Sequence, residues 1–591
     1  MYVKQPDDHD EKESTSNGRR TILKGIGGTI GSGLLASLAG CLGDGSAEAS
    51  GEPVRELEFV SYTRDHEQIH TALSEIADRM EDELGFDIDF QPMNRDRMIT
   101  RTFTERSHDL SSLGYTGRPH RLDPHMLLYR NNHSSQTASG GYNWSNYVDE
   151  ETDELLERQA RIMDPEERVD AVKEAQAYLM DQPAGEMPIV HGNLINVLNR
   201  ERFDNWVNVA GLGYKNYWTW TQVTPKTDRT QLVSAYTVSP ASGGVNPLSA
   251  GEANLIIHRL THDKLIRLDE DAQPTGSLAT NWDVSDDGTT VTFHLREELP
   301  EFHDGEQLTA EDVAFSYNWI KEHQIPFYED AVDPVENAEA IDDHTVVIEL
   351  EEEFAPIWVL AFSRVFILPK HIWENVPEEV GADMPWETQT VDEDLFDNGI
   401  IGSGPFQFTH IRRGEEIGVE ANPDHWDAPE IDEMVIRIVP EASAQTRMLE
   451  TGEVDFLIEA SANPDVLEDL ATENDHLSFE AIDSVGYDEL AMNTRRPPLD
   501  DPDVRGAISS IIPKDQIAEE MFRGYARPAH SPTAPVLEFW FNEDVKRWTE
   551  YSADEAREML EDAGYGFDDD GILYYPEGEV PDEIPDGPPD N

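Results

Sequence analysis

Short stretches of the chain alternate between apolar and polar residues, and this alternation predicts β-strands. Val291, Phe293 and Leu295 are separated by polar residues, so their side chains would all lie on one face of a strand. The preceding stretch 286–288 reads DDG, which is the composition of a tight turn. The sequence therefore predicts a half-buried strand that begins after this turn.

Helical spacing of apolar residues follows shortly afterwards. Thr309 can cap a helix with its hydroxyl group, and Asp312, three positions further on, can return a hydrogen bond to the cap. Val313, Tyr317 and Ile320 then share one face. We expect a helix that begins after Thr309 and buries this face.

A pair of helices is expected near residue 164. Asp164 has the character of an N-cap, and Pro165 suits the first turn of the helix that follows it. The helix before it is predicted from a single apolar stripe: Leu155, Leu156, Ala160 and Met163. The acidic residues between these positions would face water.

The first 41 residues have the pattern of an export signal. Arg19 and Arg20 precede the stretch 25–40, which is small and apolar but too short and too rich in glycine to span a membrane. The paired arginines resemble a twin-arginine signal, and residues 38–41, LAGC, resemble a lipobox ending at Cys41. Cys41 is the only cysteine, so no disulfide forms within the chain. A lipid on Cys41 would tether the protein outside the cell membrane.

Composition narrows the function classes further. The chain has 121 acidic and 44 basic residues, a net charge of −77, and the acidic residues are spread along its whole length. Nucleic acid is excluded as a partner, because phosphate binding requires a basic surface. With 38% apolar residues the chain can still bury a large core, so its acidity is typical of a protein from an extreme halophile.

Six segments resemble, in order and spacing, solute-binding proteins of extracellular family 5, the peptide and nickel class of ABC importers. They are 232–260, 265–297, 302–320, 402–427, 448–457 and 492–517. The resemblance implies an α/β fold with two lobes, like periplasmic binding proteins of type II, in which one lobe carries an extra subdomain. The lobes would close on a solute and present it to a membrane permease.

The remaining segments that resemble the family occur in a different order from the order in other family members. Segments that resemble its C-terminal part lie near the N-terminus, at 54–93, 108–124, 142–159 and 187–199. A circular permutation, with the old termini fused near 219–231, would explain this order. A fusion of two fragmentary binding proteins, or a domain-swapped assembly, would also explain it.

The permuted resemblance implies a set of domain boundaries. They are a signal at 1–41, a linker at 42–53, the second lobe at 54–189, the first lobe at 190–265, the extra subdomain at 266–400, more of the first lobe at 401–484, and the rest of the second lobe with an acidic, proline-rich tail at 485–591.

The resemblance also implies ligand-binding residues in the loop after 113. In peptide-binding members, the position matching Arg118 is an aspartate that pairs with the peptide's amino terminus, so Arg118 would favour a carboxylate or phosphate. Tyr115 would be an aromatic wall, or simply core. Asp123 could be the functional acid, or the acid that Arg118 balances.

The implied protein is a monomeric substrate-binding lipoprotein for a peptide-like or other small polar solute, without a cofactor, and it works with ABC permease and ATPase subunits. A receptor or adhesion module of the same fold is an alternative. His66, Glu67 and His70 match the H-E-x-x-H pattern of zinc hydrolases, but the metzincin extension is absent. We therefore expect a binding protein rather than an enzyme.

Overall fold

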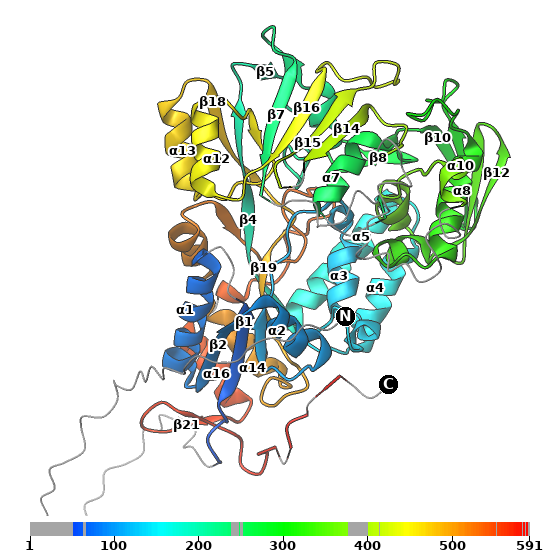
Figure 1. The fold of residues 1–591 in the computed structure, drawn as a ribbon. Coiled ribbons are helices and arrows are strands. Elements are labelled where there is room, and N and C mark those ends of the chain that lie inside the picture. Colours follow the sequence, from blue (N-terminus) through cyan, green and yellow to red (C-terminus); the bar gives the residue numbers. More distant parts are fainter. Residues whose placement is uncertain are drawn as a thin grey trace, which may run out of the picture. The chain divides into compact units, whose positions relative to one another are not determined.

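The computed structural model of the chain describes residues 51–62, 67–237, 247–248, 252–375, 400–412, 414–550, 552–581, 583–585 and 587–588. The expected α/β class is confirmed, because helices and strands are interspersed throughout these ranges (Figure 1). None of the helices described there combines the length and the apolar character that a membrane span requires.

Within the described ranges, a mixed sheet of 12 strands organises the fold around β4 (Glu186–Asn199). The C-terminal part of β4 pairs with what we call the β7 half: β7 (Gln231–Tyr236), β14 (Phe406–Arg412), β15 (Glu416–Ala421), β16 (Glu433–Ile438), β17 (Phe456–Leu457) and β18 (Leu477–Asp483). Its N-terminal part pairs with the β1 half: β1 (Leu57–Tyr62), β2 (Ile88–Met93), β3 (Leu110–Ser112), β19 (Asp488–Met492) and β20 (Ala526–Pro528). One continuous strand therefore joins the two halves, as Figure 1 shows.

The β1 half is built from both ends of the chain. Helix α1 (Glu67–Leu84) connects the parallel strands β1 and β2, and it packs against α14 (Pro502–Ser510) and α16 (Ala553–Asp562). The shared core includes buried side chains from all three helices: Ile69, Leu73, Ile76, Met80, Val504, Ile508, Ala556 and Leu560. Segments that are remote in sequence thus form one hydrophobic core.

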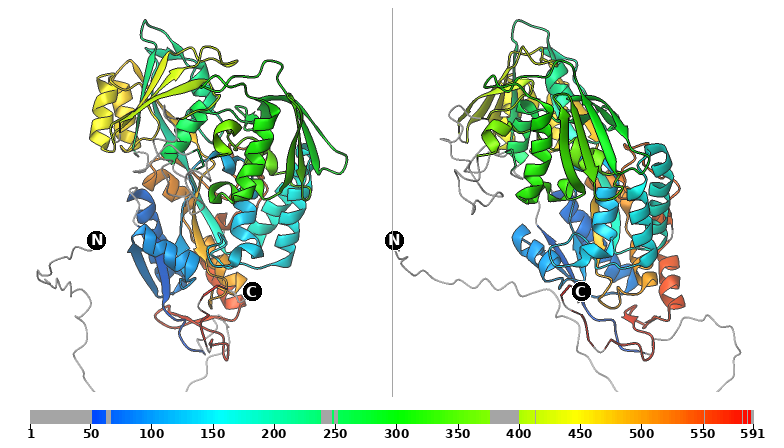
Figure 2. Two further views of the ribbon diagram at one scale, coloured as in Figure 1. Left: turned by 45° about the vertical axis from the view of Figure 1, so that its right-hand side comes forward. Right: turned by 90° about the vertical axis from the view of Figure 1, so that its right-hand side faces the viewer.

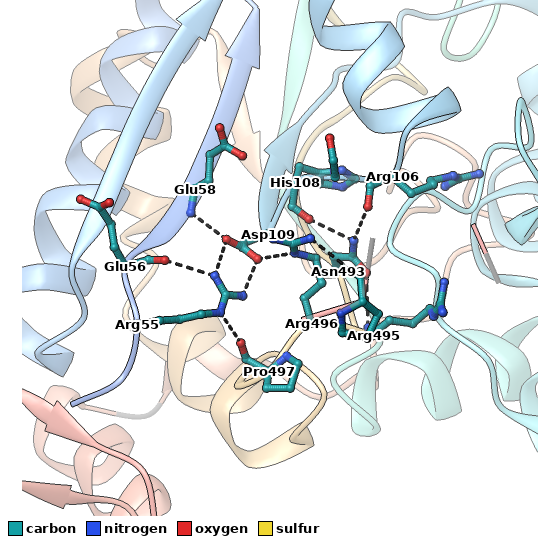
Figure 3. Close-up of polar contacts among 12 residues, drawn as sticks. Arg55, Glu56, Glu58, Arg106, His108, Asp109, Asn493, Arg495, Arg496 and Pro497 are labelled. Carbon is teal, nitrogen blue, oxygen red and sulfur yellow. Dashed lines mark hydrogen bonds and ion pairs between the residues drawn. The ribbon is translucent and has the colours of Figure 1, made fainter. Parts of the chain in front are cut away.

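Asp109 connects these remote segments through buried ion pairs (Figure 3). Arg55 donates to one carboxylate oxygen at 2.7 Å, and Arg496 donates to the other at 2.6 Å. The Arg55 Nε atom also donates to the carbonyl oxygen of Pro497 at 2.9 Å. Burial opposes ionisation of Asp109, but the two guanidinium groups hold its pKa below the usual range.

A separate four-stranded antiparallel sheet, covered by helix α8 (Ala310–Glu322), lies within residues 266–375, which we call the subdomain. Its strands, in spatial order, are β10 (Ala279–Val284), β11 (Thr290–Leu295), β13 (Thr345–Leu350) and β12 (Val335–Asp342). The predicted strand is confirmed in β11, where Val291, Phe293 and Leu295 are buried. The predicted helix start is confirmed too, because Thr309 and Asp312 form a capping box.

The helices near residue 164 lie beside the subdomain in both views of Figure 2. Helix α4 (Glu150–Arg161) and helix α5 (Pro165–Asp181) are present as predicted, and Asp164 caps α5. The stripe of α4 is shorter than expected, because the helix ends before Met163. Ile162 adopts an extended conformation there, and Met163 packs against the subdomain core instead.

Candidate functional site

A pocket lies where the β1 half, the β7 half and the subdomain meet. The pocket is open to solvent, and its empty volume is about 420 Å³ when the solvent space at its mouth is included. Its lining residues come from the loop after β3, from the end of helix α7 (Glu252–Thr261) and the residues after it, and from the subdomain: Arg118, Pro119, His120, Arg259, Lys264, Phe327, Tyr328, Arg364 and Phe366. Four of these residues carry cationic groups, and none of the described lining residues is acidic.

Lys264 is the most buried cation of the pocket, with 8% of its surface exposed. Its ammonium group donates to the carbonyl oxygen of Ser363 at 2.8 Å and lies 5.3 Å from the ring centre of Phe366. Burial lowers the pKa of Lys264 well below its usual value, and the positive charges of Arg267, Arg259 and Arg364 lower it further.

Arg364 is held in place by aromatic rings and by an acid outside the pocket lining. Its guanidinium carbon lies 4.6 Å from the ring centre of Phe327 and 5.2 Å from that of Tyr328. It also forms a 3.0 Å ion pair with Asp330. The rings of Phe327 and Tyr328 therefore both contact the guanidinium and line the pocket.

Arg118 is half-buried and lies in extended conformation at the start of the short helix η2 (Pro119–Leu122). Within the described part of the chain, its guanidinium group forms no hydrogen bond and no ion pair. The neighbouring His120 lies close to several of the same positive charges. Burial lowers the pKa of His120 well below its usual value, and the charges of Arg364, Arg121 and Arg118 lower it further.

The other two residues expected to bind ligand lie in separate clusters. Tyr115 is buried between Trp144 and Tyr487, at ring distances of 5.9 and 5.1 Å. Asp123 is also buried and accepts two hydrogen bonds from Arg168, at 2.6 and 2.7 Å. Of the three predicted residues, only Arg118 belongs to the described lining of the pocket.

Sequence reasoning missed the remaining cations of the pocket. A signal was available, because the stretch 258–268, HRLTHDKLIRL, contains Arg259, Lys264 and Arg267 in a chain where basic residues are scarce. Arg364 gave a weaker signal, because the nearest other basic residue in the sequence is Lys370, six positions away. Only the packing of the subdomain brings it to the same pocket.

The other predicted motifs lie partly or wholly outside the described residues. The residues that the structure does not describe include Arg19, Arg20, Cys41 and His66. The ring of His70 packs 5.5 Å from that of Phe90. Among the described residues, no three histidine, cysteine or acidic side chains gather in a way that could hold a metal ion.

Residues 273–586 match the sequence model described as "Bacterial extracellular solute-binding proteins, family 5 Middle", which covers more than half of the chain. Di/tripeptide-binding protein 2 of Pseudomonas aeruginosa is 30% identical over 328 residues, 52% of this chain and 58% of that protein. The dipeptide-binding protein of Escherichia coli is 30% identical over 310 residues, 49% of this chain and 54% of that protein. The chain therefore spans little more than half the length of these two relatives.

Among solved structures, NikZ from Campylobacter jejuni in complex with Ni(L-His) is 22% identical, with a TM-score of 0.45, and the match covers 61% of this chain and 67% of that one. The sequence match of residues 273–586 alone carries the assignment, since it extends over most of the subdomain and the following strands up to β22 (Leu573–Tyr574). The chain belongs to family 5 of the extracellular solute-binding proteins.

Proposed function

We propose that the protein is the substrate-binding component of an ABC importer, which captures a small polar solute in the pocket at Arg118 and Lys264 and delivers it to a membrane permease. One observation carries this proposal: the walls of the pocket come from both halves of the large sheet and from the subdomain. A relative movement of these parts would open and close the pocket, as in other hinged binding proteins. The names of the two relatives, which are peptide-binding proteins, also support it.

The cellular location belongs to the same proposal. Export through Arg19 and Arg20, followed by attachment of a lipid to Cys41, would hold the protein at the outer face of the cell membrane. This position would keep it close to the permease. The support is the sequence pattern of residues 19–41 and the membership of a family of extracellular proteins.

We also propose that the chain is a circular permutation of the usual family order. The strands β1, β2 and β3 from its N-terminal part complete the sheet beside β19, and α1 shares a core with α14 and α16. A single compact unit from residue 46 onward contains all of these elements. An intramolecular rearrangement explains this packing without a second chain.

The proposed function is tested in two steps. Small molecules extracted from protein purified in molar KCl are identified by mass spectrometry, and uptake of the identified compound is then measured in cells that lack the gene. We expect one dominant compound, and its uptake should be lost in the deleted strain. A bound compound whose uptake is unchanged in that strain would favour a receptor instead.

A further inference from the structure

We propose that the pocket selects an organic solute with at least two negative charges, such as a di- or tricarboxylate or a phosphate ester. This inference rests on the proposed solute-binding function and specifies the chemical class of the solute. It depends on three features of the pocket: the nature of its cations, the absence of acids among its described lining residues, and its aromatic wall.

The concentration of cations is unusual for this chain. Acidic residues outnumber basic ones by 121 to 44, so an average pocket would contain more carboxylates than cations. This one brings Arg118, Arg259, Lys264 and Arg364 together, and the described lining has no acid. Because positive charges repel each other at short range, such a cluster costs stability unless an anion joins it.

The contacts of Lys264 indicate that the anion would bind inside the pocket. A buried ammonium group is expected to be paired with an acid, but the hydrogen bond described for Lys264 goes to the neutral carbonyl group of Ser363. Two of its three protons remain for other acceptors. An anionic ligand would provide those acceptors and would also stabilise the charged form of the side chain.

Arg118 and Arg364 suit the recognition of more than one charged group. The guanidinium of Arg118 has no hydrogen bond or ion pair with the residues described, so its planar set of donors is available to a carboxylate or phosphate. Arg364 is partly neutralised by Asp330, which lies outside the described lining, so it contributes less charge. Lys264 and Arg118 together therefore favour a ligand with at least two negative charges.

The aromatic wall indicates an organic anion rather than an inorganic ion. Phe327, Tyr328 and Phe366 line the same pocket as the cations. Their rings offer apolar contact to the carbon body of a ligand, which a bare phosphate or chloride ion cannot use. In molar KCl this contact is needed, because chloride competes for the cations while salt screens their longer-range attraction.

Calorimetry in molar KCl tests the inference with four groups of probes. The carboxylate group is tricarballylate and the dipeptide Glu-Glu, the phosphate group is glycerol 3-phosphate and inorganic phosphate, the neutral probe is Ala-Ala, and the cationic probe is Lys-Lys. We expect an organic anion to bind at least tenfold more tightly than Ala-Ala, Lys-Lys and inorganic phosphate. Which organic anion binds distinguishes a carboxylate from a phosphate ester as the natural chemistry.

Three variants locate the binding. Arg118→Gln and Lys264→Met should each weaken binding of the organic anion by about 10- to 100-fold, the loss expected for a hydrogen bond between charged groups. Arg412→Gln is the matched control, because Arg412 is 63% exposed at the end of β14 and pairs with Glu416. It should bind as the parent does. If Lys264→Met does not fold, the affinity of Arg118→Gln alone tests the inference, because the side chain of Arg118 is only half-buried.

The outcomes separate this inference from the proposed function. Tight binding of Ala-Ala or Lys-Lys without binding of the anions would overturn the inference and leave the solute-binding function in place. Equal affinity of the parent and Arg118→Gln for an anion would also overturn it, because the anion would then bind elsewhere. Failure of every probe, together with the absence of any compound in the mass-spectrometric extract, would overturn both.

Discussion

The backbone amide of Val54 donates a hydrogen bond to the carbonyl oxygen of Leu573, 2.8 Å away. The contact continues on either side, because Tyr575 donates to Glu52 at 3.0 Å and Pro53 forms an antiparallel bridge with Tyr574. The first described segment of the chain therefore lies against one of its last. A connection between them would have to cross only a short distance.

This contact predicts that the order of the chain can be changed without loss of the fold. A gene that encodes residues 230–591 followed by 54–229 should give a folded protein with unchanged ligand affinity, because only the connectivity differs. Circular dichroism and thermal unfolding in molar KCl measure the fold. A second rearranged chain that is opened inside α1 should not fold, because that helix is part of the core. Failure of the first chain to fold would favour a fusion of two domains.

Loss of the ion pair between Asp123 and Arg168 should have a large effect on stability. Both side chains are buried, and Asp123→Asn would leave the charge of Arg168 without its partner. The free energy of unfolding should fall by about 3–5 kcal/mol, measured by urea denaturation in molar KCl. The exposed pair of Arg158 and Glu174 provides the control, since Glu174→Gln should cost less than about 1 kcal/mol. If Asp123→Asn kept its stability but lost ligand binding, Asp123 would be the functional acid.

Glu186 predicts a dependence of stability on pH. Its buried carboxyl group accepts hydrogen bonds from Tyr487 and Asn131, and burial raises its pKa from 4.5 to about 7. Between these values the folded protein keeps a proton that the unfolded chain has lost, so the free energy of unfolding falls as pH rises through this window. We expect this single group to contribute a fall of up to about 3 kcal/mol.

The variant Glu186→Gln isolates this contribution. Gln cannot ionise, so the free energy of unfolding of the parent minus that of the variant should decrease between pH values of about 4.5 and 7. Buried histidines such as His108, His125 and His191 titrate in both proteins, and their effects cancel in the difference. A difference that does not change with pH would contradict the prediction.

The export signal predicts two distinct phenotypes. Cys41→Ser should release the protein into the medium, because the lipid that holds it at the membrane would have no attachment site. Replacing Arg19 and Arg20 together by lysine should instead retain the protein inside the cell. Immunoblots of medium, membrane and cytoplasm distinguish these results. Cys41→Ser protein that stays on membranes after washing at high salt would contradict the lipoprotein assignment.

The sequence by itself determined the elements that depend on neighbouring residues. The helix after Thr309 and the strand at Val291, Phe293 and Leu295 were predictable, because caps and periodic burial involve positions only a few residues apart. The predicted apolar stripe of the helix before Asp164 extended to Met163, two residues beyond the end of the helix at Arg161. The chain must become extended before Asp164, because that residue caps the next helix. The apolar pattern by itself does not show that the first helix ends before Met163.

Only the tertiary structure decided which side chains meet. Arg118 could be singled out from its loop, but its neighbours Lys264 and Arg364 come from other parts of the chain. The partner of Asp123 is likewise Arg168, on another helix, rather than the nearby Arg118. Such pairings depend on how helices and strands pack across the large sheet, and packing is set by shape and burial over the whole fold rather than by local spacing. The charge of the pocket is therefore a property of the fold, in a chain whose overall composition has the opposite sign.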